Sequence, residues 1–263
     1  MFERSKLLLR PFRFIMARKN YYLEGPRSRW EELKFTFRIL GETIKGFRTL
    51  HFVGPCVSVF GSARFKEDHK WYNDARKTGQ LLAEKGFTVM TGGGPGIMEA
   101  ANRGAMEAGG RSVGCNITLP MEQTHNPYMD KWVTFNYFFI RKFIMFKYSY
   151  AFIIMPGGMG TMDEMFEALT LVQTHKVEHF PIVLFGKEYW KNLMGMLQTM
   201  VDEGTINADD LELVLYTDDV NEAVEHVAKH AVERFGLKRV KQPKPSKVLL
   251  EYFIRKGRLP NVR

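Results

Sequence analysis

Two glycine-rich segments, each placed between an apolar run and a stretch with helical spacing, most strongly limit how this chain folds. The first reads MTGGGPGIME (residues 90–99) and the second reads MPGGMGTMDE (residues 155–164). The runs that enter them, FTVM (87–90) and AFIIM (151–155), are typical of short buried strands. A strand that turns through glycines into a helix directs backbone N–H groups and the positive helix end to one place. The two segments therefore predict an α/β fold with a pocket for a nucleotide monophosphate or a sugar phosphate.

Strand-like and helix-like segments alternate along most of the 263 residues. This alternation predicts a parallel sheet covered by helices on both faces, in which ligands bind beyond the carboxyl ends of the strands. Pro95 is expected in the first turn of a helix, where proline is tolerated. The other expected strands cover residues 56–60, 112–117, 132–135, 181–185 and 214–216, and the expected helices cover residues 28–50, 67–85, 95–108, 138–148, 161–175, 218–235 and 246–256, with one more ending near residue 200.

The distribution of charge divides the chain into three parts. Residues 1–50 hold 12 Lys and Arg against 5 Asp and Glu, and residues 234–263 hold 10 against 1. Residues 51–233 hold 16 against 23, so the net charge of +9 belongs to the two ends. We expect a basic helical N-terminal extension over residues 1–51, a catalytic body over residues 52–235 and a basic C-terminal tail over residues 236–263.

The basic ends leave two interpretations open. They could bind nucleic acid or another anionic surface through electrostatic attraction. They could equally serve solubility and subunit packing. We favour the second interpretation, because no nucleic-acid-binding motif accompanies the charge.

The sequence predicts a cytoplasmic protein without a membrane span. No apolar run reaches the roughly 18 residues that a membrane-spanning helix needs. Arg10, Pro11 and Arg13 interrupt the apolar residues near the N-terminus, where no signal core or small-residue cleavage site is found. Cys56 and Cys115 both lie in expected strands, so we expect buried, reduced thiols.

The first glycine segment does not match two common nucleotide-binding motifs. Its glycines lack G-x-G-x-x-G spacing, and no strand ending in an acidic residue follows at the expected distance. Neither glycine segment has the Gly-Lys-Ser/Thr ending of a Walker A motif. The sequence therefore argues against a dinucleotide-dependent dehydrogenase and gives no support to ATP hydrolysis.

The second glycine segment carries a candidate catalytic carboxylate. Gly157, Gly158 and Gly160 allow the backbone to approach a phosphate closely. Thr161 is placed to donate its hydroxyl and its amide. Glu164 follows three residues later, a spacing that also fits a capping box at the helix start. Because a capping box does not explain the glycines, we favour a functional Glu164 that lines the pocket.

A second candidate lies in the apolar stretch FFIRKFI (residues 138–144), which has helical spacing. A charged Arg141 in such a stretch needs a partner or a water-lined cavity. A structural salt bridge or a snorkelling side chain would meet this need. An arginine directed at a bound ligand is the more specific hypothesis.

The two glycine segments with their flanks resemble the signature of a known family. TGGGPGIMEAAN (residues 91–102) and PGGMGTMDE (residues 156–164) are similar to the paired motifs of the LOG (Lonely Guy) family. That family comprises cytokinin riboside 5′-monophosphate phosphoribohydrolases and related nucleotide nucleosidases, and its members have long carried the label "possible lysine decarboxylase". The resemblance covers about residues 52–235, and the motifs are specific in combination.

The resemblance implies a Rossmann-like three-layer fold, here with helical N- and C-terminal extensions, and a homodimer or larger homo-oligomer with the active site at the subunit interface. It implies hydrolysis of the N-glycosidic bond of a nucleoside 5′-monophosphate, as in cytokinin biosynthesis, with no metal and no organic cofactor. The family's catalytic pair falls on Arg141, in a segment like Met-His-x-Arg-Lys, and on Glu164. This chain has Phe138 and Phe139 in place of the methionine and histidine, a change that bears on base specificity.

The expected reaction needs a carboxylate near the ribose, because breaking a ribosyl C–N bond builds positive charge on the sugar. Glu164 is the candidate that stabilises this charge or activates water, and Arg141 holds the phosphate or stabilises the departing base. We expect backbone amides of residues 157–161 to hold the 5′-phosphate. The expected substrate-binding residues are Gly157, Gly158, Gly160, Thr161, Gly93, Gly94, Glu99, Asn102, Ser62 and Arg64.

Two other functions stay open. A decarboxylase that uses pyridoxal phosphate needs a lysine that forms a Schiff base, and Lys142 and Lys147 are the nearest candidates, although both are more simply ordinary helix residues. A non-catalytic nucleotide-binding or regulatory protein would bind nucleotide tightly without releasing the base. The base itself is also open: N6-modified adenine, plain adenine and other purines or pyrimidines all fit the sequence.

Overall fold

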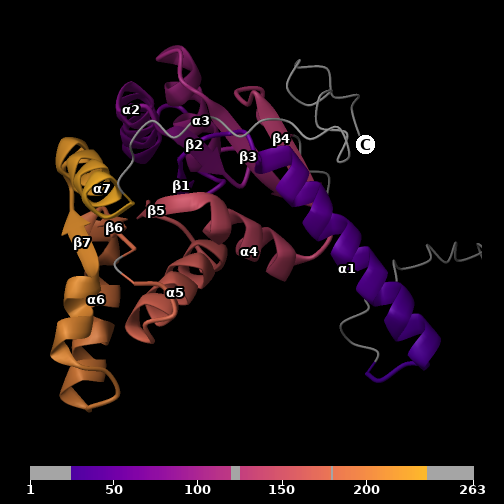
Figure 1. The fold of residues 1–263 in the computed structure, drawn as a ribbon. Coiled ribbons are helices and arrows are strands. Elements are labelled where there is room, and N and C mark those ends of the chain that lie inside the picture. Colours follow the sequence, from indigo (N-terminus) through magenta and orange to yellow (C-terminus); the bar gives the residue numbers. More distant parts are fainter. Residues whose placement is uncertain (1–24, 120–124, 179, 236–263) are drawn as a thin grey trace, which may run out of the picture. The chain divides into compact units, whose positions relative to one another are not determined.

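The computed structural model describes residues 25–119, 125–178 and 180–235 (Figure 1). Contacts within the chain divide it into two compact units, Met1–Leu40 and Gly41–Arg263. The described part of the first unit consists mainly of the start of helix α1, whereas every strand of the sheet belongs to the second unit. The domain boundaries expected after residues 51 and 235 stay predictions.

The second unit contains one seven-stranded sheet in which all paired strands run parallel. Its order is β4-β3-β2-β1-β5-β6-β7 (Figure 1). The chain first builds outward from β1 to β4 and then places β5 on the other side of β1. In α/β sheets, ligands bind where the strand order reverses in this way. The strands are β1 Cys56–Phe60, β2 Thr88–Thr91, β3 Ser112–Ile117, β4 Lys131–Phe135, β5 Ser149–Ile154, β6 Ile182–Phe185 and β7 Val214–Thr217.

Helices cover both faces of this sheet, as the sequence predicts. On one face, α2, α3 and α7 share an apolar core with Val57, Val59 and Ile153 of the strands. On the other face, Phe146 of α4 lies edge-on to Phe152 of β5, with ring centroids 5.3 Å apart. Burial on both faces explains why the central strands are apolar at nearly every position. The helices are α2 Lys70–Glu84, α3 Ile97–Glu107, α4 Phe138–Tyr148, α5 Met159–Gln173, α6 Lys187–Asp202 and α7 Val220–Phe235, with a 3-10 helix at Ala208–Leu213.

The three-layer α/β fold is confirmed, and the starts of α2 and α3 differ from the prediction for reasons that the loops before them show. α2 begins at Lys70 rather than near residue 67, because Nδ1 of His69 accepts a hydrogen bond from the amide of Trp71 at 3.2 Å and caps the helix there. Pro95 does not lie in the first turn of α3. Gly96, with a φ of +70°, is the N-cap, so Pro95 precedes the helix.

Helix α1 (Arg29–Leu50) confirms the helix expected over residues 28–50. Its last turns pack on the sheet domain: the rings of Phe47 and Phe143 lie 6.2 Å apart, and Nζ of Lys45 donates to the carbonyl of Thr134 at 3.0 Å. The remainder of the expected N-terminal extension (residues 1–24), the basic tail and its expected helix at 246–256 lie outside the described residues.

Two smaller expectations can also be compared with the structure. Cys56 and Cys115 are buried and free, as predicted. Within the described ranges, no helix has the length and apolarity needed to cross a membrane.

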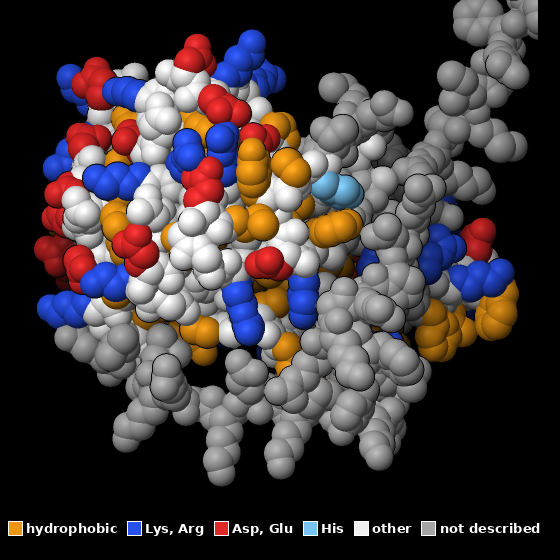
Figure 2. Space-filling view, turned by 90° about the horizontal axis from the view of Figure 1, so that it is seen from above, with side chains coloured by type: hydrophobic (Ala, Val, Ile, Leu, Met, Phe, Trp, Pro, Cys, Tyr) orange, Lys and Arg blue, Asp and Glu red, His pale blue; other side chains and the backbone are white. Residues whose placement is uncertain are grey.

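Acidic and basic side chains are interspersed on the face of the protein shown in Figure 2. Some of the described acidic and basic side chains form ion pairs: Arg76 of α2 pairs with Glu107 of α3, and Arg103 pairs with Glu67. On this face, an anion would therefore depend on local groups rather than on a field of one sign.

Candidate active site

Three loops meet at the carboxyl ends of β1, β2 and β5. The loop at residues 61–64 follows β1, and the two glycine segments follow β2 and β5. The amide of Ser62 donates to the carbonyl of Pro156 at 3.0 Å, and the carbonyl of Ser62 accepts from the amide of Ile97 at 3.0 Å. Ser62 therefore ties both glycine segments to the loop after β1, and the segments that the sequence assigned to one pocket lie together.

Two glycines permit this close approach of the loops. A Cβ at Gly157 would lie 2.2 Å from Oγ1 of Thr161 and 3.0 Å from the amide nitrogen of Ser62. Gly93 has a φ of +72°, and a Cβ there would lie 1.8 Å from Oδ1 of Asn116. A larger residue at either position would force the loops apart.

The N-terminus of α5 is open to solvent beside these loops. The helix begins at Met159, two residues earlier than predicted, after Gly158 as its N-cap. Met159 is 86% exposed, and a Cβ at Gly158 or Gly160 would meet no atom within 4 Å. In the part of the chain that the structure describes, the amides of Met159 and Gly160 have no acceptor, whereas the amide of Thr161 donates to the carbonyl of Gly158. Open amides at a helix N-terminus suit a phosphate group.

Helices α4 and α5 bring the two predicted catalytic side chains together. Nη2 of Arg141 lies 3.3 Å from Oε1 of Glu164. Glu164 is only 2% exposed. Desolvation by burial raises the pKa of Glu164 to about 7, against the opposing influence of the Arg141 and Lys142 charges. A carboxyl group with this pKa can hold or release a proton near neutral pH, as general acid–base chemistry requires.

The geometry excludes one of the alternatives that the sequence left open for each of these two residues. Thr161 lies inside the first turn of α5 and is not its N-cap, so the capping-box hypothesis for Thr161 and Glu164 is wrong. The side chain of Arg141 is 15% exposed, so it does not snorkel to solvent, and its pair with Glu164 is a salt bridge such as the sequence offered as one alternative. Nε of Arg141 is buried, and among the described residues it has no hydrogen-bond partner. This donor remains available to a ligand or a water molecule.

Aromatic side chains lie next to the Arg141 guanidinium. Its central carbon is 5.2 Å from the ring centroid of Phe138, within the range of a cation–π contact. Its Nη1 would be 3.9 Å from a Cβ at Gly92, so the guanidinium also reaches the first glycine segment. Phe138 and Phe139 are 49% and 44% exposed. The ring beside the arginine is thus that of Phe138, which stands at the methionine position of the family motif, whereas Phe139, at the histidine position, lies 5.7 Å from the ring of Tyr137.

The structure argues against Lys142 as a Schiff-base lysine. Its Nζ lies 2.9 Å from Oδ1 of Asp163 and 2.9 Å from Oε2 of Glu167. Hydrogen bonds to these carboxylates outweigh desolvation and hold the pKa of Lys142 above its usual value, so the amine stays protonated and is a poor nucleophile. Lys147, the other candidate, is exposed at the end of α4. Over the described ranges, no group of three or more His, Cys, Asp or Glu side chains is arranged to hold a metal ion.

Two predicted contact residues are engaged by the protein itself. Asn102 is fully buried: its Oδ1 accepts from the hydroxyl of Thr91 at 2.6 Å, and its Nδ2 donates to the hydroxyl of Ser112 at 2.7 Å. Glu99 accepts a hydrogen bond from the hydroxyl of Tyr72 at 3.1 Å. Both side chains therefore help to fix α3 behind the first glycine segment.

Ser62 and Arg64 lie in the loop after β1. The hydroxyl of Ser62 accepts a hydrogen bond from the amide of Arg64 at 3.1 Å. Arg64 is exposed, so its guanidinium is accessible to a ligand that enters from solvent.

Two residues that the sequence did not single out hold the glycine segments in place. The amide of Asn126 donates to the carbonyl of Gly93 at 3.1 Å, and its Nδ2 donates to the carbonyl of Gly94 at 3.0 Å. The hydroxyl of Tyr189 donates to the carbonyl of Gly157 at 2.8 Å. Asn126 precedes a proline, which is a recognisable turn signal, whereas nothing in the sequence near Tyr189 shows that it reaches a distant loop.

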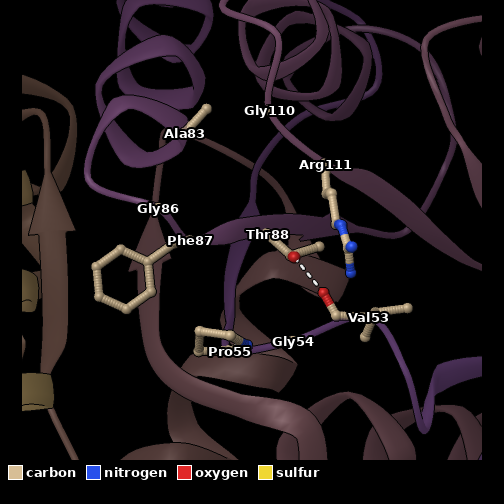
Figure 3. Close-up of a pocket in the computed structure, with 9 residues that line it drawn as sticks. All are labelled: Val53, Gly54, Pro55, Ala83, Gly86, Phe87, Thr88, Gly110 and Arg111. Atoms are coloured by element: carbon tan, nitrogen blue, oxygen red, sulfur yellow. Dashed lines mark hydrogen bonds between the residues drawn. The ribbon is translucent and has the colours of Figure 1, made fainter. Parts of the chain in front are cut away.

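A cavity of about 260 Å³ lies at the amino-terminal ends of the strands, opposite the ends that carry the glycine segments (Figure 3). The hydroxyl of Thr88 donates to the carbonyl of Val53, and Nη1 of Arg111 donates to the carbonyl of Phe52 at 3.0 Å. None of the residues that line this cavity is Asp, Glu, His or Cys. It therefore offers no acid–base group. The lining residues are Val53, Gly54, Pro55, Ala83, Gly86, Phe87, Thr88, Gly110 and Arg111.

Comparisons with known proteins identify the family. A family model described as "Possible lysine decarboxylase" matches residues 98–227. The cytokinin riboside 5′-monophosphate phosphoribohydrolase of Mycobacterium tuberculosis is 31% identical over 155 residues, which make up 57% of this chain and 81% of that protein. An X-ray structure from a structural genomics consortium is 26% identical with a TM-score of 0.50, and the match covers 66% of this chain and 99% of that one.

A further solved structure shares the fold. The molybdenum cofactor binding protein from Rippkaea orientalis is 24% identical with a TM-score of 0.51, and the match covers 66% of this chain and 96% of that one. A shared fold does not determine the ligand, which depends on the site. The paired glycine segments and the similarity to the mycobacterial enzyme show that the chain belongs to the LOG family, the family of the cytokinin riboside 5′-monophosphate phosphoribohydrolases.

Proposed function

We propose that the protein hydrolyses the N-glycosidic bond of a nucleoside 5′-monophosphate, with an N6-modified adenine or another purine as the base, to the free base and ribose 5-phosphate. Family membership supports this class of reaction, because the mycobacterial relative carries it in its name. The observation that carries the proposal is the contact of the buried Glu164 with Arg141, at the carboxyl ends of the strands. Burying a carboxyl group that pairs with an arginine costs folding free energy, and such a group is typical of functional sites.

The 5′-phosphate is proposed to bind at the N-terminus of α5. The open amides of Met159 and Gly160 can donate to its oxygens, and the helix dipole favours its negative charge. Glu99 and Asn102 are proposed to shape the pocket from behind, because other side chains already engage them. The remaining proposed substrate contacts come from Ser62, Arg64, Gly93, Gly94, Gly157, Gly158 and Thr161.

Glu164 is proposed to act on the ribose. As the C1′–N bond breaks, its electron pair leaves with the base and positive charge develops on the sugar. The carboxylate form of Glu164 stabilises this charge and accepts a proton from the water molecule whose oxygen bonds to C1′. The proton then passes to the departing base, so that Glu164 returns to its carboxylate form and the atoms balance.

Arg141 is proposed to stabilise negative charge on the departing base or on the phosphate. Its guanidinium lies between Glu164 and the first glycine segment, and its buried Nε has no partner among the described residues. A preorganised donor in a partly desolvated site stabilises developing charge more strongly than water does. The exposed ring of Phe138 next to the guanidinium favours a flat, apolar base.

We also propose that the protein forms a homodimer or a larger homo-oligomer. Phe138, Phe139 and Phe143 on α4 are 49%, 44% and 52% exposed, and aromatic side chains grouped in this way commonly mark an interface. Light scattering coupled to size-exclusion chromatography measures the mass directly. A monomer at micromolar concentration would contradict this part of the proposal.

The experiment that tests the reaction is an incubation of the purified protein with a panel of nucleoside 5′-monophosphates, including N6-isopentenyladenosine monophosphate. Free base and ribose 5-phosphate are both measured. We expect equimolar release of the two products and a loss of release of about 10³-fold in Glu164→Gln, with nucleotide binding retained. Glu84→Gln is the matched control, because Glu84 is exposed at the last residue of α2 and accepts a hydrogen bond from Gln80 of its own helix.

Two outcomes would contradict the proposal. Near-normal turnover in Glu164→Gln would remove Glu164 from the chemistry. Tight nucleotide binding without base release from any nucleotide of the panel would instead support a non-catalytic nucleotide-binding or regulatory protein.

A further inference from the structure

Two consecutive basic residues of α4 contact three acidic residues of α5. Arg141 meets Glu164 at 3.3 Å, and Lys142 meets both Asp163 and Glu167 at 2.9 Å. The two carboxylates that Lys142 binds lie on either side of Glu164 in the sequence. Lys142 therefore holds the segment of α5 that carries Glu164 against the segment of α4 that carries Arg141.

Burial distinguishes these ion pairs from ordinary surface pairs. The side chain of Lys142 is 15% exposed, whereas those of Asp163 and Glu167 are 57% and 38% exposed. An ammonium group enclosed in this way has given up much of its hydration and depends on its two carboxylate partners. Two partners also fix the position of Nζ more tightly than one partner would. The amine of an exposed lysine is rarely held in one position in this way.

We propose that Lys142 is a positioning residue for Glu164, which fixes α5 against α4 through Asp163 and Glu167 so that Arg141 and Glu164 keep their contact. This inference rests on the proposed function, since it concerns the same carboxylate. Lys142 does not touch the substrate in this role. A displacement of reacting groups by about 1 Å can cost on the order of 10²-fold in rate, so a clamp between the two helices matters for catalysis.

The charges around Glu164 affect its pKa, which gives a second readout besides the rate of base release. Arg141 and Lys142 face it from α4, Asp163 and Glu167 face it from α5, and the buried thiol of Cys115 lies on β3. The two cations lower the pKa of Glu164, and the two carboxylates raise it. Removing the lysine charge and removing the carboxylates therefore shift this pKa in opposite directions, although both changes break the clamp.

The test compares Lys142→Met with the double variant Asp163→Asn/Glu167→Gln. We expect both to lower kcat at the optimal pH by about ten-fold or more, with KM changed less than three-fold. We expect the acidic limb of the pH–rate profile to move to higher pH in Lys142→Met and to lower pH in the double variant. Lys142→Arg, which keeps the charge and a reach to both carboxylates, should recover most of kcat. Lys147→Met, at the exposed end of the same helix, is the control and should behave as the wild type.

Two patterns would overturn the inference. A raised KM with unchanged kcat in Lys142→Met, together with a normal KM in the double variant, would make Lys142 a direct substrate ligand. A wild-type kcat in the double variant would show that the charge of Lys142 acts without any clamp.

A measurement that needs no turnover separates this inference from the proposed function. The carboxyl carbon of Glu164 is followed by NMR titration of ¹³C-glutamate-labelled protein, with Glu164→Gln to assign the signal. An upward shift of its pKa in Lys142→Met and a downward shift in the double variant are expected even if no nucleotide is hydrolysed. Unchanged titration in both variants would show that Lys142, Asp163 and Glu167 are not held around Glu164, and would contradict the inference whatever the outcome of the activity assay.

Discussion

The amino-terminal ends of the strands, which form the amino-terminal edge of the sheet, and their carboxyl ends, which form the carboxyl edge, differ in the functional groups that they carry. The amino-terminal edge has the cavity of about 260 Å³, but its lining includes one charged side chain, Arg111, which donates to a backbone carbonyl. The carboxyl edge has the three loops tied by Ser62, an open helix N-terminus and the Glu164–Arg141 contact. A hollow alone therefore does not locate an active site. The proposed active site is distinguished instead by the desolvation of ionisable groups beside open backbone donors.

An arginine on each edge provides the most direct test of this difference. Arg141→Ala should lower kcat/KM for base release by about 10²–10³-fold, because it removes a cation that faces Glu164. Arg111→Ala should leave kcat/KM within about two-fold, because that side chain donates to the backbone carbonyl of Phe52, away from the proposed site. Steady-state kinetics with one nucleotide substrate measure both. Equal losses in the two variants would erase the distinction between the edges.

The raised pKa of Glu164 implies that the carboxyl edge lowers the stability of the fold at neutral pH. Its pKa is about 7 in the folded protein and 4.5 for the unperturbed group, so the folded state favours the protonated form. The unfolding free energy that protonated Glu164 contributes is fully present below pH 4.5 and is lost as the pH rises through 7. Relative to Glu164→Gln, the wild type should lose about 3 kcal/mol of unfolding free energy between pH 5 and pH 8.

Urea unfolding of both proteins at a series of pH values measures this difference. Subtracting the variant from the wild type removes the contributions of all other titrating groups that the two share. A difference that stays constant from pH 5 to pH 8 would show that Glu164 is not desolvated as the structure indicates.

The packing of the glycine segments predicts a change that affects both stability and binding. Gly157→Ala would put a Cβ 2.2 Å from Oγ1 of Thr161, so the loop after β5 must move. We expect a loss of about 1–3 kcal/mol in unfolding free energy and weaker nucleotide binding. Gly160→Ala is the matched control for stability, because a Cβ there meets no atom within 4 Å. Equal stability of the two variants would contradict the tight contact at Gly157.

Most of the fold could be predicted because its signals are local. Apolar runs of strand length, glycine turns and helical spacing lie within a few residues of each other and identify each element. The starts of α2 and α3 were harder to place. His69 acts as a cap although histidine is not a typical one, and the conformation of Gly96 excludes Pro95 from the helix. Both depend on the path of the loop before the helix, which the residue pattern does not specify.

The candidate site could be predicted only where a motif carried it. Glu164 follows a glycine segment, and Arg141 interrupts an apolar helix, so both were visible in the sequence. The clamp from Lys142 to Asp163 and Glu167 arises from the packing of α4 against α5, and the contact of Tyr189 with Gly157 from the packing of α6 against the second glycine segment. Contacts of this kind depend on tertiary structure, and no spacing rule encodes them.

The smallest effect is expected at the amino-terminal edge. Thr88→Val removes the hydroxyl that donates to the carbonyl of Val53 and leaves that buried acceptor without its partner. We expect a loss of about 1 kcal/mol in unfolding free energy, because the shape of the side chain is kept and only one hydrogen bond is lost. Base release should stay at the wild-type level, since the cavity contains no acid–base group. Urea unfolding and the product assay are run on the same preparation. A fall in base release without a change in stability would place a functional role at this edge and would break the contrast between the two edges.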